Sequence, residues 1–257
     1  MVISALVFGS LGTLTETSHL HQRAFNDTFI DEGLGWHWDL PIYQRLLRVV
    51  GGGSRIVHYS RETGDGPVLT EAEAEDLQAK KTARYVELLR AEGVELRPGV
   101  ERLFAEAAAA GLALGLATGT SMANLTANLD AAGRRLTLDA FDAYTVRSEG
   151  VPSKPAPDLH RMCIARLDAD PAATVAIEDT TDGVVSAAGA GAMVVATPGD
   201  YVTDHDFSAA TVVVDCLGDP ERPASLVPAG PEEGTRPELP ELPEKMVTLE
   251  WLASIRQ

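Results

Sequence analysis

The sequence contains few cysteines and no long apolar run. Two cysteines in 257 residues, Cys163 and Cys216, are too few for a disulfide framework and lack the spacing of metal ligands. No run approaches the roughly 18 apolar residues of a membrane span, and the first residues have neither the basic flank nor the cleavage site of a signal peptide. These absences predict a cytoplasmic protein without a membrane partner.

Basic residues are also scarce. The 21 lysines and arginines stand against 38 aspartates and glutamates, which gives a formal net charge of −17. Such a surface repels nucleic-acid phosphates and anionic lipids, so we expect no nucleic-acid partner, whereas a small anion in a locally basic cleft remains compatible. Hydrophobic residues make up 45% of the chain, which is enough for a globular core and excludes wholesale disorder.

Short apolar runs alternate with helix-length segments through most of the chain. The runs are typical of buried parallel strands and span residues 3–8, 112–117, 143–146, 174–177, 192–196 and 211–214. The helix-length segments span residues 100–110, 122–132, 157–167 and 181–190. This alternation predicts an α/β fold with a doubly wound, Rossmann-like parallel sheet.

Two segments depart from this alternation. Residues 17–92 show amphipathic helical spacing without a clear strand, so we interpret them as a helical domain inserted into an α/β core of residues 1–16 and 93–218. Seven of the fifteen prolines fall between Pro220 and Pro243, which predicts a Pro/Glu-rich loop at 219–246 before a C-terminal helix in 247–257. We favour a solvated connection for this loop over a protein-docking peptide.

Polar residues follow the predicted strands at the edge where the carboxyl ends of parallel strands meet. Thr118-Gly119 supply a hydroxyl and free backbone N–H groups at the start of a helix, which suit a phosphate. Lys154 lies in a proline-rich turn, and Glu178-Asp179 form a pair suited to a hard cation such as Mg²⁺. Thr118 could instead cap a helix, and the acidic pair could lie in a first helical turn. Together, however, these residues favour a phosphate site.

These residues resemble the motifs of the haloacid dehalogenase (HAD) superfamily of phosphatases and mutases. Thr118, Lys154 and Glu178-Asp179 match its motifs two, three and four, and Gly12-Thr13-Leu14 matches the second half of motif one. Within roughly residues 1–218 the resemblance points to the CbbY-like branch, sugar-bisphosphate phosphatases associated with carbon fixation. It rests further on Glu16-Thr17, Leu20-His21, Arg23-Ala24-Phe25-Asn26, Trp36-His37-Trp38-Asp39, Tyr43, Gly51-Gly52, Arg55-Ile56, Leu96-Arg97-Pro98-Gly99, Lys154-Pro155-Ala156-Pro157-Asp158 and Ala187-Ala188-Gly189-Ala190-Gly191.

The resemblance implies a HAD-type core with an α-helical cap at residues 17–92, a phosphorylated sugar as ligand and Mg²⁺ as cofactor. Motif one, however, is degraded. The family reads Asp-x-Asp-Gly-Thr-Leu, in which the first aspartate is the nucleophile and a Mg²⁺ ligand and the second is the general acid/base. This chain has Gly9 and Leu11 at those two positions. Loss of a covalent nucleophile costs on the order of 10⁴–10⁶ in rate.

Ser10 is the candidate substitute for the lost nucleophile, but strand alternation predicts that its side chain points away from the face of residues 9 and 11. In the cap, the resemblance implies substrate contacts by His21, Tyr43 and Arg55. The cap has losses as well, because Gly53 replaces the lysine of a Gly-Gly-Lys-x-Arg pattern and Ser18 replaces a glutamate.

These patterns predict a pseudo-phosphatase that has no catalytic residue of motif one left but still binds a phosphorylated sugar. Thr118, Gly119 and Lys154 would bind the phosphate, while Glu178 and Asp179 would hold Mg²⁺ with weakened affinity. The protein would act as a sensor or as a protein partner of an active relative. The alternatives are a weak or altered Mg²⁺-dependent HAD-type phosphohydrolase and a scaffold that docks through the proline-rich loop.

Overall fold

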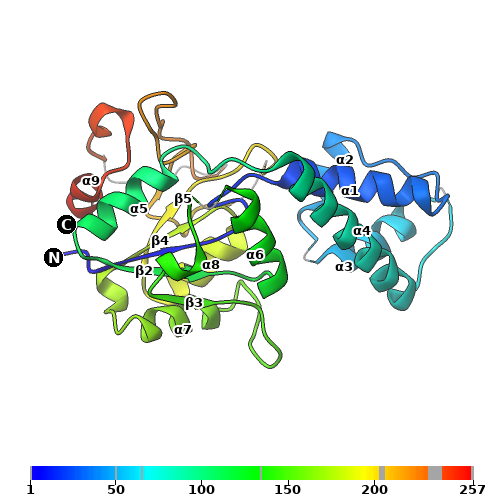
Figure 1. Ribbon diagram of the computed structural model, residues 1–257, viewed down its shortest axis with the longest axis horizontal. Coiled ribbons are helices and arrows are strands. Elements are labelled where there is room, and N and C mark those ends of the chain that lie inside the picture. The colour runs from blue at the N-terminus through cyan, green and yellow to red at the C-terminus, as the bar shows by residue number, and fades with distance from the viewer. Residues whose placement is uncertain are drawn as a thin grey trace. The chain divides into compact units, whose positions relative to one another are not determined.

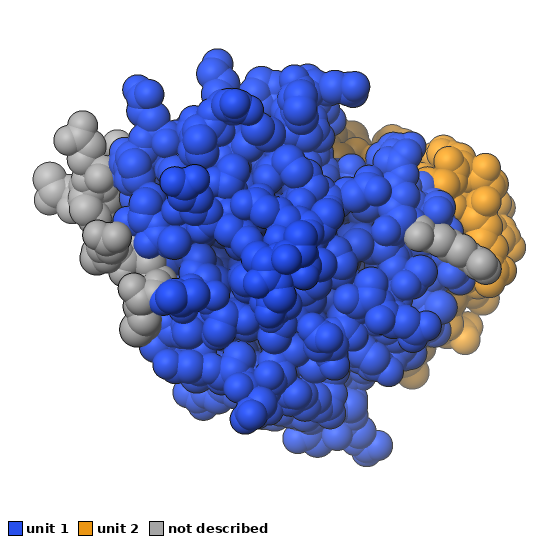
Figure 2. Space-filling model, turned by 60° about the vertical axis from the view of Figure 1, so that its left-hand side comes forward, with its two compact units in different colours: residues 1–16, 94–200, 204–257 blue, residues 17–93, 201–203 orange. Residues whose placement is uncertain are grey.

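A computed structural model describes residues 2–49, 51–64, 66–133, 135–202, 206–230 and 239–255. The chain forms two compact units (Figure 2). The α/β unit comprises residues 1–16, 94–200 and 204–257, and the helical unit comprises residues 17–93 and 201–203. Residues 231–238 of the predicted proline-rich loop and 256–257 of the predicted C-terminal helix lie outside the described residues.

The α/β unit is built on a six-stranded parallel sheet. Its strands are β1 (Ala5–Phe8), β2 (Ala113–Ala117), β3 (Ala143–Thr145), β4 (Thr174–Glu178), β5 (Met193–Ala196) and β6 (Val212–Val213). The strand order β3-β2-β1-β4-β5-β6 places β1 between β2 and β4, with Phe8 opposite both Leu116 and Ile177. The predicted α/β fold with a parallel sheet is confirmed, and the carboxyl ends of these three central strands meet at one edge.

Helices cover both faces of this sheet (Figure 1). They are α5 (Val100–Ala109), α6 (Met122–Ala131), α7 (Asp158–Arg166), α8 (Thr181–Gly189) and α9 (Leu249–Ser254). Alternate side chains of β1 serve the two faces, since Leu6 and Phe8 join the cluster that includes α5 and α6, whereas Val7 packs with Cys163 and Ile164 of α7. The wholly apolar run of β1 is therefore explained by burial on both sides.

The helical unit contains α1 (Ser18–Asp31), α2 (Leu40–Leu46), α3 (Gly52–Glu62) and α4 (Glu71–Glu92). Both α1 and α3 pack against α4. Aromatic rings dominate the core of the unit, which includes Phe25, Phe29, Trp36, Trp38, Tyr43 and Tyr59. A capping box starts α4, because Thr70 accepts a hydrogen bond from the Glu73 amide and the Glu73 carboxylate accepts one from the Thr70 amide.

The described parts of the proline-rich segment pack onto the α/β unit. The Arg102 guanidinium of α5 donates to the carbonyl oxygens of Leu217, Gly218 and Val247 at 2.8–3.0 Å. Trp251 of α9 is buried in the main apolar cluster and donates its Nε1–H to the Pro240 carbonyl oxygen at 2.9 Å. Three short 3₁₀ helices span Leu138–Ala140, Pro171–Ala173 and Pro243–Lys245.

No helix within the described ranges has the length and apolar character needed to cross a bilayer.

Candidate functional site

The loop after β1 brings position 9 to the acidic pair at the end of β4. The Gly9 amide donates to the Ile177 carbonyl oxygen at 2.8 Å. A Cβ atom on Gly9 would lie 3.2 Å from the carboxyl group of Glu178 and only 2.4 Å from Thr13 Oγ1. The Thr13 hydroxyl donates to Asp179 Oδ1 at 2.8 Å. Position 9 therefore faces the acidic pair without a side chain, and the Thr13 hydroxyl occupies part of the space that a side chain there would need.

Ser10 faces a different neighbour. Its Oγ lies 2.5 Å from Thr118 Oγ1, and both residues are buried. A second hydroxyl is not a general base, so this contact does not activate Ser10 as a nucleophile. Thr118 is not the cap of α6, because Ser121 accepts the capping bond from the Asn124 amide. The ideal Cβ position of Gly119 has no atom within 4 Å, so the turn is open there.

Lys154 and Glu178 form a buried ion pair across the same sheet edge. Lys154 Nζ donates to Glu178 Oε1 at 2.6 Å and to the Ala117 carbonyl oxygen at 3.0 Å. Glu178 is the last residue of β4, and α8 starts beyond it with Thr180 as its cap, so the acidic pair does not lie in the first turn of that helix. Burial raises the pKa of Glu178, but the charge of Lys154 and the hydrogen bond from His160 outweigh this effect and leave the pKa below its ordinary value.

His160 was not anticipated from the sequence. It is fully buried in α7, with Nε2 2.9 Å from Glu178 Oε1 and Nδ1 2.8 Å from Ser186 Oγ. Burial lowers the pKa of His160, against an opposing effect of Glu178. The sequence offered only a lone histidine three residues after Pro157, because its partner Glu178 lies at the end of β4, far from α7 in the sequence.

Arg97 fixes the loop after β1 from outside the site. Its guanidinium donates to the carbonyl oxygens of Gly12 at 2.6 Å, Pro198 at 2.8 Å and Asp215 at 2.9 Å, and also to that of Thr197. Because Gly12 has a φ of 86°, its backbone lies in the left-handed region that favours glycine. Arg97 thus ties together three loops that follow β1, β5 and β6.

The side chains present offer an incomplete set of ligands for a Mg²⁺ ion. Mg²⁺ requires near-octahedral oxygen ligands. Oε1 of Glu178 is occupied by Lys154 and His160, Oδ1 of Asp179 accepts from Thr13, and position 9 adds no carboxylate. Within the described part of the chain no three His, Cys, Asp or Glu side chains are grouped to hold a metal. Burial and the charge of Glu178 raise the pKa of Asp179 to about 7.

The helical unit contains a second polar cluster, made of basic side chains. His21 of α1 stacks on Tyr85 with ring centroids 3.8 Å apart, and its Nδ1 lies 2.6 Å from Nζ of Lys81. Lys81 on α4 is 4% exposed, and its ammonium lies 4.6 Å from the centre of the Phe25 ring. Arg55 of α3 donates its Nε–H to the carbonyl oxygens of Leu46 and Val49.

Among the described residues, these three basic groups have no carboxylate as a counter-charge. No carboxylate in the described ranges pairs with His21, Lys81 or Arg55. Burial, followed by the charge of Arg55, lowers the pKa of Lys81 to about 7. Burial and then the charge of Lys81 hold the pKa of His21 well below its ordinary value. A buried cation without a partner is costly, and an anion placed here would remove that cost.

Of the predicted contacts, His21 and Arg55 belong to this basic cluster. Tyr43 of α2 is buried in the aromatic core of the same unit. Its ring packs edge-on against that of Tyr201, with 76° between the ring planes and 5.9 Å between the centroids. Lys81 was missed, although its spacing was informative. It lies four residues after Leu77 and four before Tyr85, on the buried stripe of α4.

Comparisons with known proteins agree with this architecture. Residues 3–191 match the haloacid dehalogenase-like hydrolase family. Protein CbbY of Rhodobacter capsulatus is 40% identical over 210 residues, which cover 82% of this chain and 92% of that protein. The plasmid CbbY protein of Cupriavidus necator is 40% identical over 225 residues, which cover 86% and 88%.

A solved structure extends the likeness to three dimensions. The crystal structure of a CbbY mutant from Rhodobacter sphaeroides in complex with xylulose-(1,5)bisphosphate has a TM-score of 0.74 and 36% identity, and the match covers 84% of this chain and 95% of that one. The likeness thus includes the α/β unit as well as the helical insertion. The chain belongs to the haloacid dehalogenase-like hydrolases, in their CbbY-like phosphatase branch.

Proposed function

We propose that this protein binds a phosphorylated sugar and does not hydrolyse it through an aspartyl-phosphate. One observation carries the proposal: position 9, at the end of β1 and beside the acidic pair, has no side chain. Leu11 likewise cannot exchange a proton with a leaving group. The protein would then act in the cytoplasm as a sensor of its ligand or as a partner of an active relative.

Phosphate-binding groups support the first half of the proposal. Lys154 has three N–H donors, of which the Ala117 carbonyl and Glu178 use two, so one is left for a phosphate oxygen. The Thr118 hydroxyl and the open backbone at Gly119 lie on the turn before α6, where free N–H groups attract anions. These groups bind an anion and require no nucleophile.

The basic cluster of the helical unit is a second group of side chains that favours an anion. Lys81 is buried and His21 and Arg55 are half-buried, none of them with a carboxylate partner in the described ranges. An anion would restore the positive charge that burial removes from Lys81. The relative from Rhodobacter sphaeroides was crystallised with a sugar bisphosphate. We therefore propose the same chemical class, with Tyr43 as a further contact in this unit.

Weakened Mg²⁺ binding is part of the proposal. With position 9 empty and Glu178 engaged by Lys154, Asp179 is the main carboxylate that remains for a cation. We expect ligand binding to depend little on Mg²⁺.

A weak or altered Mg²⁺-dependent phosphohydrolase is the second candidate. The observation that favours it is the intact Lys154–Glu178 pair beside Asp179, which a binding protein does not need in full. This candidate requires a nucleophile outside motif one.

The test is phosphate release from sugar mono- and bisphosphates with Mg²⁺, combined with calorimetric binding. Wild type is compared with the double variant Gly9→Asp, Leu11→Asp, in which Thr13 must rotate to admit the new carboxylate. We expect wild type to bind without turnover and the double variant to turn over. Turnover by wild type would establish the second candidate, and absence of binding by both proteins would refute the proposal.

A further inference from the structure

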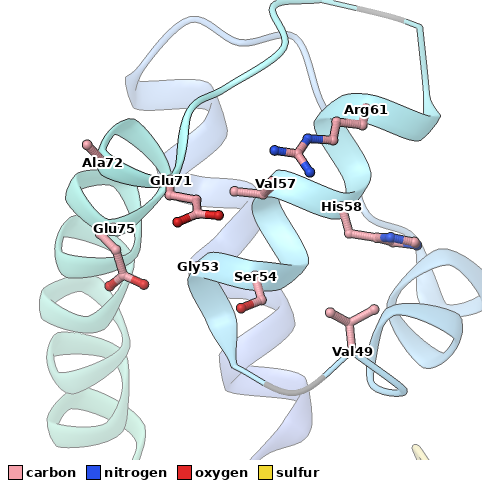
Figure 3. A pocket seen from close by; sticks show the side chains of 9 residues that line it. All are labelled: Val49, Gly53, Ser54, Val57, His58, Arg61, Glu71, Ala72 and Glu75. Atoms are coloured by element: carbon pink, nitrogen blue, oxygen red, sulfur yellow. The ribbon is translucent and has the colours of Figure 1, made fainter.

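A cavity of about 540 Å³ lies within the helical unit, between α3 and the first turns of α4 (Figure 3). This volume is within the range of small-molecule sites. The cavity is lined by Val49, Gly53, Ser54, Val57, His58, Arg61, Glu71, Ala72 and Glu75. Arg55 lies about 200° around α3 from Gly53, so the cavity and the basic cluster use different faces of that helix.

The two walls of the cavity carry opposite charges. Glu71 and Glu75, one turn apart on α4, point their carboxylates toward α3. Arg61 lies on the α3 wall with its guanidinium directed into the space above Val57. Within the described residues, Arg61, Glu71 and Glu75 make no ion pair or side-chain hydrogen bond. The walls therefore hold both signs of charge without neutralising each other.

Gly53 keeps this space open. A Cβ atom there would lie 2.5 Å from Glu75 Oε1, so any side chain would displace the carboxylate. The pattern implied by the family resemblance has a lysine at this position, and the Cβ atom of such a residue would meet the Glu75 carboxylate.

A third acceptor lies on the same face of α4. Gln78 follows Glu75 by three residues, and its Oε1 is buried without a hydrogen-bond partner among the described residues. Its Nε2 donates to Thr82 at 3.1 Å, so the amide orientation is fixed with the oxygen toward α3. The face of α4 that packs against α3 therefore includes an acceptor, Gln78 Oε1, for which the described residues supply no donor.

We propose that this cavity binds a small dipolar molecule of the amino-acid class, with a primary ammonium at one end and a carboxylate at the other. The ammonium lies between Glu71 and Glu75, the carboxylate pairs with Arg61, and Val57 contacts the apolar middle. Because both ion pairs are partly exposed, each contributes modestly, and selectivity arises from engaging the two ends together.

The test titrates the full-length protein with 6-aminohexanoate in phosphate-free buffer. Binding is measured by the shifts of backbone amide signals in NMR spectra. Hexylamine and hexanoate each lack one charge and serve as matched ligands. We expect saturable shifts in residues 53–61 and 71–78 with 6-aminohexanoate, and at least fivefold weaker binding of the two single-charge compounds. Equal binding of hexylamine, or no saturable shift with 6-aminohexanoate, would overturn the proposal.

Variants locate the site independently of the probe. The double variant Glu71→Gln, Glu75→Gln and the variants Arg61→Gln and Gly53→Lys should each weaken binding at least fivefold. Glu87→Gln removes a negative charge from the far end of α4 and should bind as wild type does. Unchanged affinity in both Gly53→Lys and the double variant would place the probe elsewhere and refute the proposal.

Discussion

At the scale of single residues, position 9 has no side chain although it lies beside the acidic pair at the end of β4. The other groups of this site form hydrogen bonds with one another. Lys154 donates to Glu178, and Thr13 donates to Asp179. Each of these contacts joins segments far apart in sequence. Topology predicts that such residues meet at one edge, but their partners follow only from side-chain geometry.

At the residue scale, replacing Lys154 with Met should strongly destabilise the α/β unit. Glu178 is 2% exposed and would lose its cation, and breaking such a buried pair costs about 3–5 kcal/mol. Urea unfolding at pH 7 measures the loss, and Lys245→Met, at an exposed lysine, is the control. A Lys154→Met protein as stable as this control would contradict the assignment.

Lys81 gives the stability a defined pH dependence. Its pKa is about 7 in the folded protein against an ordinary 10.5, so the unfolded chain holds the extra proton between these two values. The free energy of unfolding should therefore rise with pH from about 7 to about 10.5, by a few kcal/mol from this residue.

Lys81→Met should abolish this rise in the free energy of unfolding. Its stability should exceed that of wild type by the largest margin at pH 7. Lys80→Met, at the neighbouring exposed lysine, should keep the rise. Urea unfolding of the three proteins at pH 7 and pH 9.5 checks both expectations. Parallel pH profiles for Lys81→Met and wild type would show that Lys81 is charged when buried.

At the scale of elements, the sequence predicts strands and helices well where an apolar run is buried on both faces. The six predicted strands are present, and the helices α5 to α8 begin and end within one or two residues of the predicted bounds. Continuous apolar runs such as that of β1 carry this information because both of their faces are covered. Lys81 and His160 were not predicted, because a position on the buried face of a helix does not indicate which polar group the side chain contacts.

The start of α4 is a second testable element. Thr70→Ala removes the capping box and should lower the free energy of unfolding of the helical unit by about 1 kcal/mol. Thermal unfolding followed by circular dichroism measures the change. Thr70→Ser preserves the hydroxyl and should restore most of the loss, which an effect of side-chain volume alone would not do.

Trp251 tests whether α9 is integral to the α/β unit. Its side chain is 3% exposed in the main apolar cluster, so Trp251→Ala should cost about 3–5 kcal/mol. Val185→Ala, at a residue that is 42% exposed, should change the stability little. A small effect of Trp251→Ala in urea unfolding would show that α9 is dispensable.

At the scale of the whole molecule, anion binding should appear as stabilisation. A net charge of −17 disfavours anions in general, so a response to inorganic phosphate must come from local basic groups. Phosphate at 100 times its Kd adds about 2.7 kcal/mol. The rise in melting temperature should be larger at pH 6 than at pH 9, because Lys81 is protonated at the lower pH, and Lys81→Met should reduce this difference.

The residues that flank the inserted segment 17–93 lie next to each other in the α/β unit. Thr15 and Leu96 form an antiparallel bridge just outside the insertion, and the Arg97 amide donates to the Leu14 carbonyl oxygen at 2.8 Å. The two ends of the inserted segment are thus held side by side by these backbone contacts. A segment attached at two adjacent points can change in length without altering the strand order of the sheet, so the helical unit and the sheet are free to vary separately.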